Sequence, residues 1–380
     1  MTAQPVPLSI LDLAPVTSGG TVGDALRNTL DLASQAERFG YRRYWLAEHH
    51  FAPGVASAAP AVLIALVAAA TSRMRVGAGA VQLGHQTPLA VVEQFGIIDA
   101  LYPGRIDLGL GRSGQRRAEM LRRANEERAS QPGPARTVNG LLIPAPFSVA
   151  RVARSPRLAL HASMLQQPGA QSPDFADQVG DIIALIGGTY RSADGLEAHA
   201  VPGEGAAVEL WILGSSGGQS AQLAGELGLP FAANYHVSPA TVLEAADAYR
   251  KAFRPSATLA APHVLVSADA VVAPDEAAAR ELAAPYGLWV RSIRTGAGAV
   301  PFPTPAQAAA HDWTGEDRAL VADRVDTQFV GSPETVVTKL RVLQEATQAD
   351  ELLVTTITHD HADRVRSYAL LAAEWARWRR

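Results

Sequence analysis

The chain of 380 residues contains no cysteine. This absence excludes disulfide bonds, thiolate nucleophiles and thiolate-bound metal sites. Charge is also sparse, because charged residues make up 18% of the chain and the formal net charge is −4. A nucleic acid or an anionic membrane is therefore not expected as a partner, since both select strongly basic surfaces.

Long hydrophobic runs are missing as well. The most apolar window, residues 56–70, is rich in alanine and is interrupted by Pro60. A helix that spans a bilayer needs about 20 apolar residues. The first residues lack the basic start and apolar core of a signal peptide. Together with the absence of cysteine, these features predict a cytoplasmic protein.

Short apolar runs alternate with helical patterns along nearly the whole chain, 48% of which is hydrophobic. Eight runs have strand character, and a helical pattern follows each of them: residues 8–13, 43–47, 74–81, 105–110, 209–213, 229–233, 263–267 and 351–356. Alternating strands and helices predict a parallel sheet, and eight units favour closure into one (β/α)8 TIM barrel over residues 1–380. An open doubly wound sheet is the alternative.

Two stretches lack a regular pattern. Residues 131–172 follow the fourth strand, and residues 294–328 follow the seventh βα unit. Structureless segments of this length in a compact domain are typical of lids and binding loops, so we expect two irregular insertions. The arginine-rich helical pattern at 116–128 is either a solvated face or a lid that attracts an anion. Ser332, followed by Pro333, predicts the start of a helix.

The second predicted strand ends in Glu48, His49 and His50. Titratable groups at the carboxyl ends of parallel strands are typical of active sites in α/β proteins. Neighbouring strand residues point to opposite faces, so both imidazoles cannot enter one pocket while the strand continues. The alternative is a solvated loop. Glu48 is expected to support the strand end or to orient His49.

Side chains are unusually small at the end of the third strand, in the sequence Gly77-Ala78-Gly79-Ala80. Glycine weakens a strand unless something approaches its backbone closely. That neighbour is either a flat ligand ring or a crowded barrel interior. The sequence therefore predicts a close contact at this strand without identifying the group that makes it.

The sequence Gly109-Leu110-Gly111-Arg112-Ser113-Gly114 matches the dinucleotide-binding pattern literally. The strand ending in an acidic residue that this pattern requires about 20 residues later is missing. A tight exit from the fourth strand explains the glycines better. In that interpretation Arg112 is a cation at the barrel mouth.

A second loop rich in glycine and serine, residues 213–220, joins a predicted strand to a helix. Backbone N–H groups and the hydroxyls of Ser215, Ser216 and Ser220 can surround an anion at such a helix start. The loop lacks the lysine of a nucleoside-triphosphate site, so a phosphate monoester is the expected anion. An ordinary capped turn is the alternative.

Histidines near other strand ends raise the question of a metal site. His359 and His361 follow the last strand and could join the group at 48–50, but the first strand offers only Asp12. We expect no metal, and Asp360 is a candidate helix cap. His85 and His236 lie just beyond strand ends at the predicted mouth.

Four segments, residues 44–51, 76–81, 88–111 and 213–230, together resemble the bacterial luciferase-like family of flavin-dependent oxidoreductases. The resemblance implies a (β/α)8 barrel that binds reduced flavin mononucleotide (FMN as FMNH2), or the deazaflavin F420, at its C-terminal mouth. It also implies a homodimer.

The resemblance assigns roles to individual residues. The family's catalytic histidine falls on His49, and a non-proline cis peptide behind the flavin ring falls on Gly79-Ala80. The residues carried over to the cofactor are Ala78, Gly79 and Ala80 at the ring, and Arg112, Ser215, Ser216 and Ser220 at the phosphate. His50 and His236 are expected to face the substrate. Two departures are Gly217-Gly218, which replaces a single position, and Gly111, which stands where the family has a reactive thiol.

The resemblance further implies a two-component monooxygenase. A separate NAD(P)H:flavin reductase would supply FMNH2, and O2 would oxidise a small organic substrate through a flavin C4a-peroxide. His49 would serve as the general acid and base, a task that an imidazole performs well near neutral pH. Two alternatives stay open: an F420-dependent hydride-transfer oxidoreductase and a non-catalytic flavin-binding protein.

Overall fold

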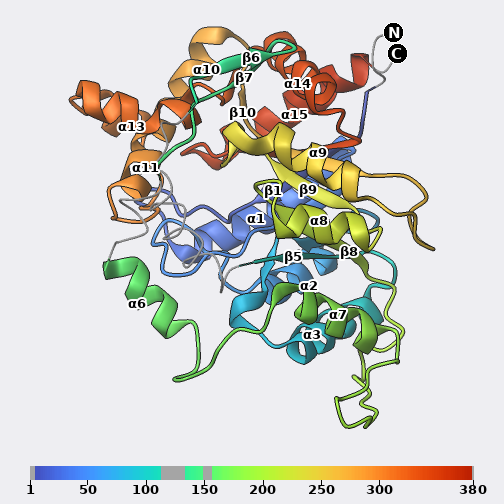
Figure 1. Cartoon of the computed structure of the whole chain (residues 1–380). Coiled ribbons are helices and arrows are strands. Elements are labelled where there is room, and N and C mark those ends of the chain that lie inside the picture. Colours follow the sequence, from blue (N-terminus) through green and yellow to red (C-terminus); the bar gives the residue numbers. More distant parts are fainter. Residues whose placement is uncertain (1–4, 113–132, 149–155, 379–380) are drawn as a thin grey trace.

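The computed structural model describes residues 5–112, 133–148 and 156–378. Eight parallel strands form the barrel: β1 (Leu8–Asp12), β2 (Arg43–Leu46), β3 (Arg75–Ala78), β5 (Ile106–Gly111), β8 (Glu209–Gly214), β9 (Phe231–Asn234), β10 (Val264–Val272) and β12 (Glu351–Thr355). β12 pairs with β1 and closes the barrel, which is surrounded by helices (Figure 1). The predicted TIM barrel is confirmed, and the open-sheet alternative is wrong.

The helices that cover the barrel follow its strands in the predicted alternation. They are α1 (Val22–Phe39), α2 (Pro60–Ala70), α3 (Pro88–Leu101), α7 (Phe175–Ile186), α8 (Gln219–Glu226), α9 (Val242–Ala252), α14 (Pro333–Thr347) and α15 (His361–Trp378). Local signals fix several ends. Gly40 ends α1 in the left-handed conformation at φ 85°, and the Ser332 hydroxyl accepts the Thr335 N–H at the start of α14.

The first insertion is more regular than the sequence predicted. It contains a hairpin of β6 (Arg136–Val138) and β7 (Leu141–Ile143), followed by α6 (Pro156–Met164). Asn139 and Gly140 have φ values of 49° and 82°, which suit a two-residue hairpin turn. The prediction of an irregular segment over 131–172 is therefore wrong for these elements. Strands of three residues are too short to give an apolar alternation, and the Asn139-Gly140 turn is the one local signal of this hairpin.

The second insertion is also regular. Two helices, α10 (Glu276–Ala283) and α11 (Pro285–Arg294), precede it. Two more, α12 (Pro305–Ala309) and α13 (Gly315–Val325), lie in the segment predicted to be irregular. Ion pairs between Arg291 and Asp317 and between Arg294 and Asp323 join α11 to α13. α13 lacks a strong apolar period of its own and is held by these contacts with α11, which is why the sequence pattern did not indicate it.

Alternate residues of the strands build two cores. Tyr44 and Leu46 of β2 point outward into the layer beneath the helices, whereas Trp45 points into the barrel. The Trp45 and Trp211 rings meet edge-on inside the barrel, with centroids 5.1 Å apart. The interior is therefore filled by side chains at this level.

A buried ion network closes the N-terminal end of the barrel. The Arg43 side chain is 1% exposed and lies 2.9 Å from a carboxylate oxygen of both Asp107 and Glu351. The Trp45 indole N–H also donates to Asp107, at 2.8 Å. These charges lie at the starts of their strands, so this network fills the N-terminal end of the barrel.

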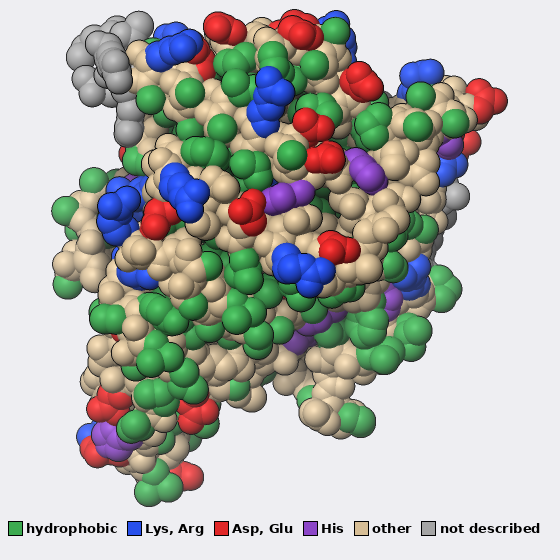
Figure 2. All heavy atoms as spheres, turned by 180° about the vertical axis from the view of Figure 1, so that it is seen from behind, with side chains coloured by type: hydrophobic (Ala, Val, Ile, Leu, Met, Phe, Trp, Pro, Cys, Tyr) green, Lys and Arg blue, Asp and Glu red, His purple; other side chains and the backbone are tan. Residues whose placement is uncertain are grey.

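Positive and negative side chains are interspersed on the face shown in Figure 2. No helix in the described ranges is long and apolar enough to cross a bilayer.

Candidate functional site

The loop after β2 carries the predicted catalytic histidine to the C-terminal mouth of the barrel. β2 ends at Leu46, so His49 and His50 lie beyond the strand. Ser57 fixes this loop, because its carbonyl accepts the His49 N–H at 2.8 Å and its hydroxyl donates to the Ala47 carbonyl. The His49 side chain is exposed, and that of His50 is half-buried.

Glu48 links this loop to the next strand. Its carboxylate lies 2.8 Å from His50 Nε2 and accepts the Gln82 N–H at 2.9 Å, and the Gln82 amide donates to the Glu48 carbonyl at 2.6 Å. Gln82 belongs to β4 (Val81–Gln82), which extends the line of β3. Glu48 therefore supports the strand end as predicted, but it orients His50 rather than His49.

His85 lies beside His50, which contacts Glu48. Its ring lies edge-on to that of His50, with centroids 5.9 Å apart. Burial lowers the pKa of His85, and His50 lowers it further, while Glu48 acts in the opposite direction. His50 thus faces Glu48 and His85, and the prediction that it faces the substrate gains no support from these contacts.

His49 is close enough to His236 to act on it electrostatically. Burial, with the charges of Arg324 and His49, lowers the pKa of His236 to about 3, so this imidazole is neutral at physiological pH. His236 Nδ1 lies 2.6 Å from the Ser267 hydroxyl on β10. The structure therefore brings His49 and His236, predicted from distant parts of the sequence, to one side of the mouth.

The small residues at the end of β3 divide into two that are buried by packing and two that reach the mouth of the barrel. A Cβ on Gly77 would lie 2.4 Å from the Asp107 carbonyl oxygen, so the crowded interior explains this glycine. Ala78 has no exposed surface, because it packs in the layer beneath the helices. The Gly79-Ala80 peptide is cis, as the resemblance implied, and both residues are half-buried. Of the three predicted ring contacts, only Gly79 and Ala80 reach solvent.

The glycines of the apparent dinucleotide motif belong to β5. A Cβ on Gly109 would lie 2.0 Å from the Ala78 carbonyl oxygen, so the approach of β3 requires glycine here. A Cβ on Gly111 would lie 3.2 Å from Ala80 Cβ, beside the cis peptide. Ser113 and Gly114 of the motif and the predicted helix at 116–128 lie outside the described residues.

The residues predicted to hold an anion lie together. Arg112 Nε donates to the Ser220 hydroxyl at 3.1 Å, and Arg112 Nη1 donates to Gln219 Oε1 at 3.3 Å. Ser216 and Ser220 are buried, and Ser215 is half-buried. No side chain caps the N-terminus of α8, which begins after Gly218. A guanidinium, hydroxyls and a helix start at one point form a suitable site for a phosphate group.

The additional glycine of this loop turns away from the anion site. The Gly217 N–H donates to Glu244 Oε1 on α9 at 3.3 Å, and a Cβ on Gly217 would lie 2.9 Å from that oxygen. The longer loop is thus accommodated on the side of α9, while Ser220 keeps its contact with Arg112.

A buried polar network at the mouth was missed by the sequence analysis. Asp269 of β10 is 3% exposed and accepts hydrogen bonds from the Gln328 amide, at 2.8 Å, and from the Tyr286 hydroxyl. The Tyr286 hydroxyl in turn accepts from Arg324 Nη2 at 2.7 Å and Nε at 3.1 Å. Burial raises the pKa of Asp269 to about 6. The one signal in the sequence is a lone acid within an apolar strand.

The two insertions meet beside His49. The Phe51 ring stacks on His161 of α6 at a centroid distance of 4.4 Å. Arg157 of α6 donates to the Ala297 carbonyl at 2.7 Å, and the Arg294 guanidinium lies 3.9 Å from the centroid of the Phe147 ring. Segments from both insertions therefore cover this side of the mouth.

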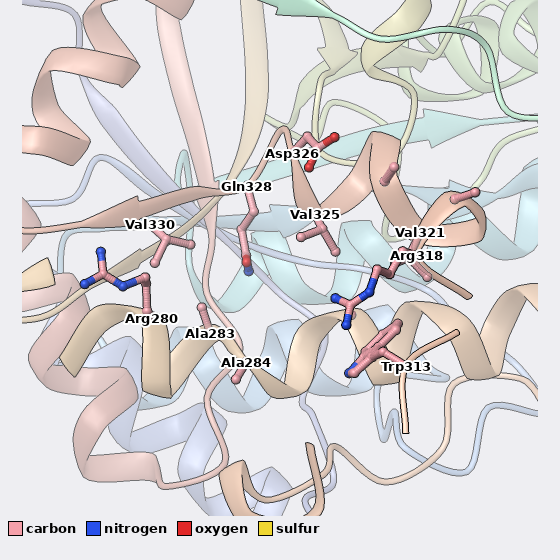
Figure 3. A pocket seen from close by; sticks show the side chains of 13 residues that line it. Arg280, Ala283, Ala284, Trp313, Arg318, Val321, Val325, Asp326, Gln328 and Val330 are labelled. Atoms are coloured by element: carbon pink, nitrogen blue, oxygen red, sulfur yellow. The ribbon is translucent and has the colours of Figure 1, made fainter. Parts of the chain in front are cut away.

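A cavity of about 580 Å³ lies between α10, α11, α13 and β11 (Phe329–Gly331). Its lining is largely apolar. Arg280 of α10 and Arg318 of α13 lie at opposite sides of it (Figure 3). Gln328, which donates to Asp269, is part of this lining. None of the predicted site residues lines the cavity.

The histidines after β12 have protein partners. His359 Nε2 lies 2.9 Å from the Ser18 carbonyl oxygen, and His361 Nε2 lies 2.8 Å from an Asp31 carboxylate oxygen. Asp360 accepts the Ala362 N–H at 2.7 Å, which confirms the predicted helix cap. Within residues 5–112, 133–148 and 156–378, no three metal-ligating side chains cluster.

Comparisons with known proteins agree with this arrangement. The model of the luciferase-like monooxygenase family matches residues 6–131 and 182–350. An Escherichia coli protein named luciferase-like monooxygenase is 34% identical over 370 residues, 97% of each chain. The uncharacterized protein YvbT of Bacillus subtilis is 37% identical over 97% of this chain and 96% of its own. A third relative, N-acetyl-S-alkylcysteine monooxygenase of B. subtilis, is 46% identical over 106 residues, which are 28% of this chain and 32% of that protein.

Solved structures show the same fold. The apo form of MsnO8 has a TM-score of 0.78 and 32% identity, covering 98% of both chains. The oxygenating component of 3,6-diketocamphane monooxygenase from Pseudomonas putida, solved with FMN, has a TM-score of 0.65 and 19% identity over 98% of both chains. An F420-dependent secondary alcohol dehydrogenase has a TM-score of 0.59 and 14% identity, covering 97% of this chain and 98% of its own. With a closed barrel, a cis peptide at the end of β3 and a family match over most of its length, this chain belongs to the luciferase-like monooxygenase family.

Proposed function

We propose that this protein is the oxygenating component of a two-component monooxygenase, which uses FMNH2 and O2 to oxidise a small organic substrate. The observation that carries the proposal is the pairing of Arg112 with Ser220 at the start of α8. This anion site lies at the same end of the barrel as His49 and the Gly79-Ala80 peptide. The full-length relative named a monooxygenase supports the choice of reaction.

The residues present fit FMN. Its phosphate would be bound by Arg112, Ser216, Ser220 and the first N–H groups of α8, whose N-cap residue Gly218 has no side chain. Its ring would lie against Gly79 and Ala80, which offer little side-chain volume. When bound in its reduced form, FMN supplies the electrons that activate O2.

His49 is the group we assign to proton transfer. Its imidazole is exposed at the mouth while its backbone is fixed by Ser57. An imidazole can both give and take a proton near neutral pH, and a positioned one typically contributes on the order of 10²–10⁴ in rate. The insertions beside it, through α6 and α11, would limit the entry of water during the reaction.

A separate NAD(P)H:flavin reductase is the partner we propose, in the cytoplasm. The glycines that resembled a dinucleotide motif are packing residues of β5, so we assign oxidation of the nicotinamide to another protein. One relative is named N-acetyl-S-alkylcysteine monooxygenase, and the substrate in that name is a thioether. We therefore choose small thioethers as the first candidate substrates to test.

A homodimer is the assembly we propose. The outer faces of α2 and α3 expose large apolar side chains at a spacing of four residues: Val62 (61%), Leu66 (48%), Ile97 (53%) and Leu101 (69%). Neighbouring apolar residues on exposed helix faces are typical of protein–protein interfaces. α2 packs against α3, so the four side chains lie on adjacent helices.

Titration of the purified protein with FMN, FMNH2, riboflavin and F420 tests the cofactor. We expect FMNH2 to bind more tightly than riboflavin or F420, and oxygen uptake with a thioether panel to require FMNH2. Binding of reduced F420 alone, with hydride transfer and no oxygen uptake, would indicate the F420-dependent alternative. Tight binding of oxidised flavin without turnover would indicate a non-catalytic flavin-binding protein.

A further inference from the structure

We propose that Arg324 binds a carboxylate of the substrate and so selects anionic substrates. This inference rests on the proposed function, because it concerns the substrate of the same mouth. Arg324 lies on α13, in the second insertion, and its guanidinium is half-buried. It would act as a specificity-determining residue that touches the substrate away from the flavin phosphate.

The guanidinium of Arg324 has hydrogen-bond donors to spare. Nε and Nη2 both donate to the Tyr286 hydroxyl, at 3.1 and 2.7 Å. A guanidinium carries five N–H donors. The contact with Tyr286 uses the edge formed by Nε and Nη2, so the edge formed by Nη1 and Nη2 can still donate hydrogen bonds to a ligand. That edge has the geometry that receives the two oxygens of a carboxylate.

Other buried arginines of the described chain are paired with acids. Arg43 meets Asp107 and Glu351, Arg294 meets Asp323, and Arg364 meets Asp12. Arg324 has no carboxylate within 4.0 Å in the described ranges, and it contacts the neutral phenol of Tyr286 instead. A partly buried cation that touches only a neutral group is suited to an external anion.

The position of Arg324 places it at the mouth. Tyr286 is 1% exposed and belongs to the apolar cluster that contains Trp45 and Ala47 of the β2 end. Arg324 and His49 both act electrostatically on His236. The three residues therefore come from the loop after β2, the loop after β9 and the second insertion, and they converge on one region.

The surroundings favour a carboxylate over a neutral group. His236 is neutral at physiological pH and shares a hydrogen bond of 2.6 Å with the Ser267 hydroxyl through Nδ1, so its Nε2 is not engaged in that contact. Asp269 and Arg324 attract each other electrostatically, but the hydrogen bonds of the Asp269 carboxyl go to Gln328 and Tyr286, so this acid fixes the phenol and makes no direct contact with the guanidinium. The network thus holds Arg324 in place without occupying its second edge.

The test compares carboxylates with their primary amides, which have the same shape and no charge. The probes are hexanoate, phenylacetate and N-acetyl-S-methylcysteine, each with its amide, titrated calorimetrically into the full chain with and without FMN. The variants are R324Q and R324K, with R318A as the control, because Arg318 lies on the same helix but lines the cavity between α10, α11 and α13. Melting temperatures show whether each variant folds.

We expect wild type to bind at least one carboxylate about 10- to 100-fold more tightly than its amide, as a charge-assisted hydrogen bond allows. R324Q should lose this preference, R324K should keep part of it, and R318A should keep all of it. The absence of any preference in wild type, including the absence of binding, overturns the proposal, as does a preference that persists in R324Q or disappears in R318A. Carboxylate binding without any FMN binding would instead contradict the proposed function alone.

Discussion

Arg112 and Ser220 are 108 positions apart in sequence, yet the guanidinium donates to the hydroxyl at 3.1 Å. The contact joins the end of β5 to the first turn of α8, across two adjacent strands of the barrel. It brings together two residues of the proposed phosphate site, and the first prediction concerns this site.

Replacing Arg112 with alanine should weaken FMN binding by about 10- to 100-fold, because a charged donor to the phosphate is lost. Riboflavin lacks the phosphate, so its affinity should not change. Flavin fluorescence titration measures both constants. R112K should fall between wild type and R112A, because lysine keeps the charge but not the planar donors. An equal loss of affinity for FMN and riboflavin would remove Arg112 from the phosphate site.

H49A should bind FMN as wild type does but lose oxygenation of the substrate by a factor on the order of 10²–10⁴. His49 lies in the loop after β2, whereas the proposed phosphate group is bound by Arg112 after β5 and Ser220 of α8. Product formed in a single turnover with FMNH2 under air is the measurement. H199A changes a histidine that pairs with Glu204 at the surface and serves as the control. Unchanged product formation by H49A would exclude His49 from proton transfer.

His236 should make stability depend on pH. Its pKa in the folded protein is lowered to about 3 by burial first, then by Arg324 and His49, whereas histidine in an unfolded chain titrates near about 6.5. Below that pH the unfolded state takes up a proton that the folded state does not. The contribution of His236 to stability is therefore complete above pH ~6.5 and decreases as the pH falls toward ~3.

Urea unfolding of wild type and H236Q at several pH values tests this linkage. From pH ~7.5 to pH ~5, wild type should lose up to about 2 kcal/mol relative to H236Q, at about 1.4 kcal/mol per pH unit below the unfolded pKa. H199Q, at the surface, is the comparison. A stability difference that does not change with pH would show that His236 becomes protonated in the folded state as readily as in the unfolded one.

The ion network at the closed end of the barrel should be essential for folding. R43M removes the buried cation that Asp107 and Glu351 share, leaving Asp107 only the half-buried Arg75, and should cost about 3–5 kcal/mol of unfolding free energy. R42M is the matched control, because Arg42 is adjacent in sequence, its side chain is 51% exposed and it lies 3.5 Å from the same Glu351. Its loss should cost less than about 1 kcal/mol. Similar melting temperatures for the two variants would contradict the assignment.

Charges on the apolar face of α2 and α3 should separate the proposed dimer. The double variant L66E/L101E places two carboxylates where the interface would exclude water, so it should sediment as a monomer at concentrations where wild type is a dimer. L196E changes an equally exposed leucine (70%) outside these helices and should remain dimeric. A wild-type protein that is itself monomeric would exclude the dimer.

Some of the site was predictable because it depends on local signals. The apolar run of β2 and the three polar residues after it predict titratable groups at a strand end, and a parallel sheet brings all such ends to one face. The serines before α8 predict an anion site for the same reason. Other parts depend on contacts between distant segments. The neighbours of His50 proved to be Glu48 and His85, and the Asp269, Tyr286 and Arg324 network joins β10 to α11 and to α13, which lies in the segment predicted to be irregular.

The sequence alone thus determined the order of strands and helices, because the spacing of apolar residues and the caps at Gly40 and Ser332 are read within a few neighbours. It also determined that chemistry would be placed after β2, β5 and β8. Only the tertiary structure decided which side chains share the mouth, why Gly77 and Gly109 must lack a Cβ, and how the two insertions fold over His49. Those features result from contacts between residues that are far apart along the chain. The spacing of residues in the sequence does not show which distant segments come into contact.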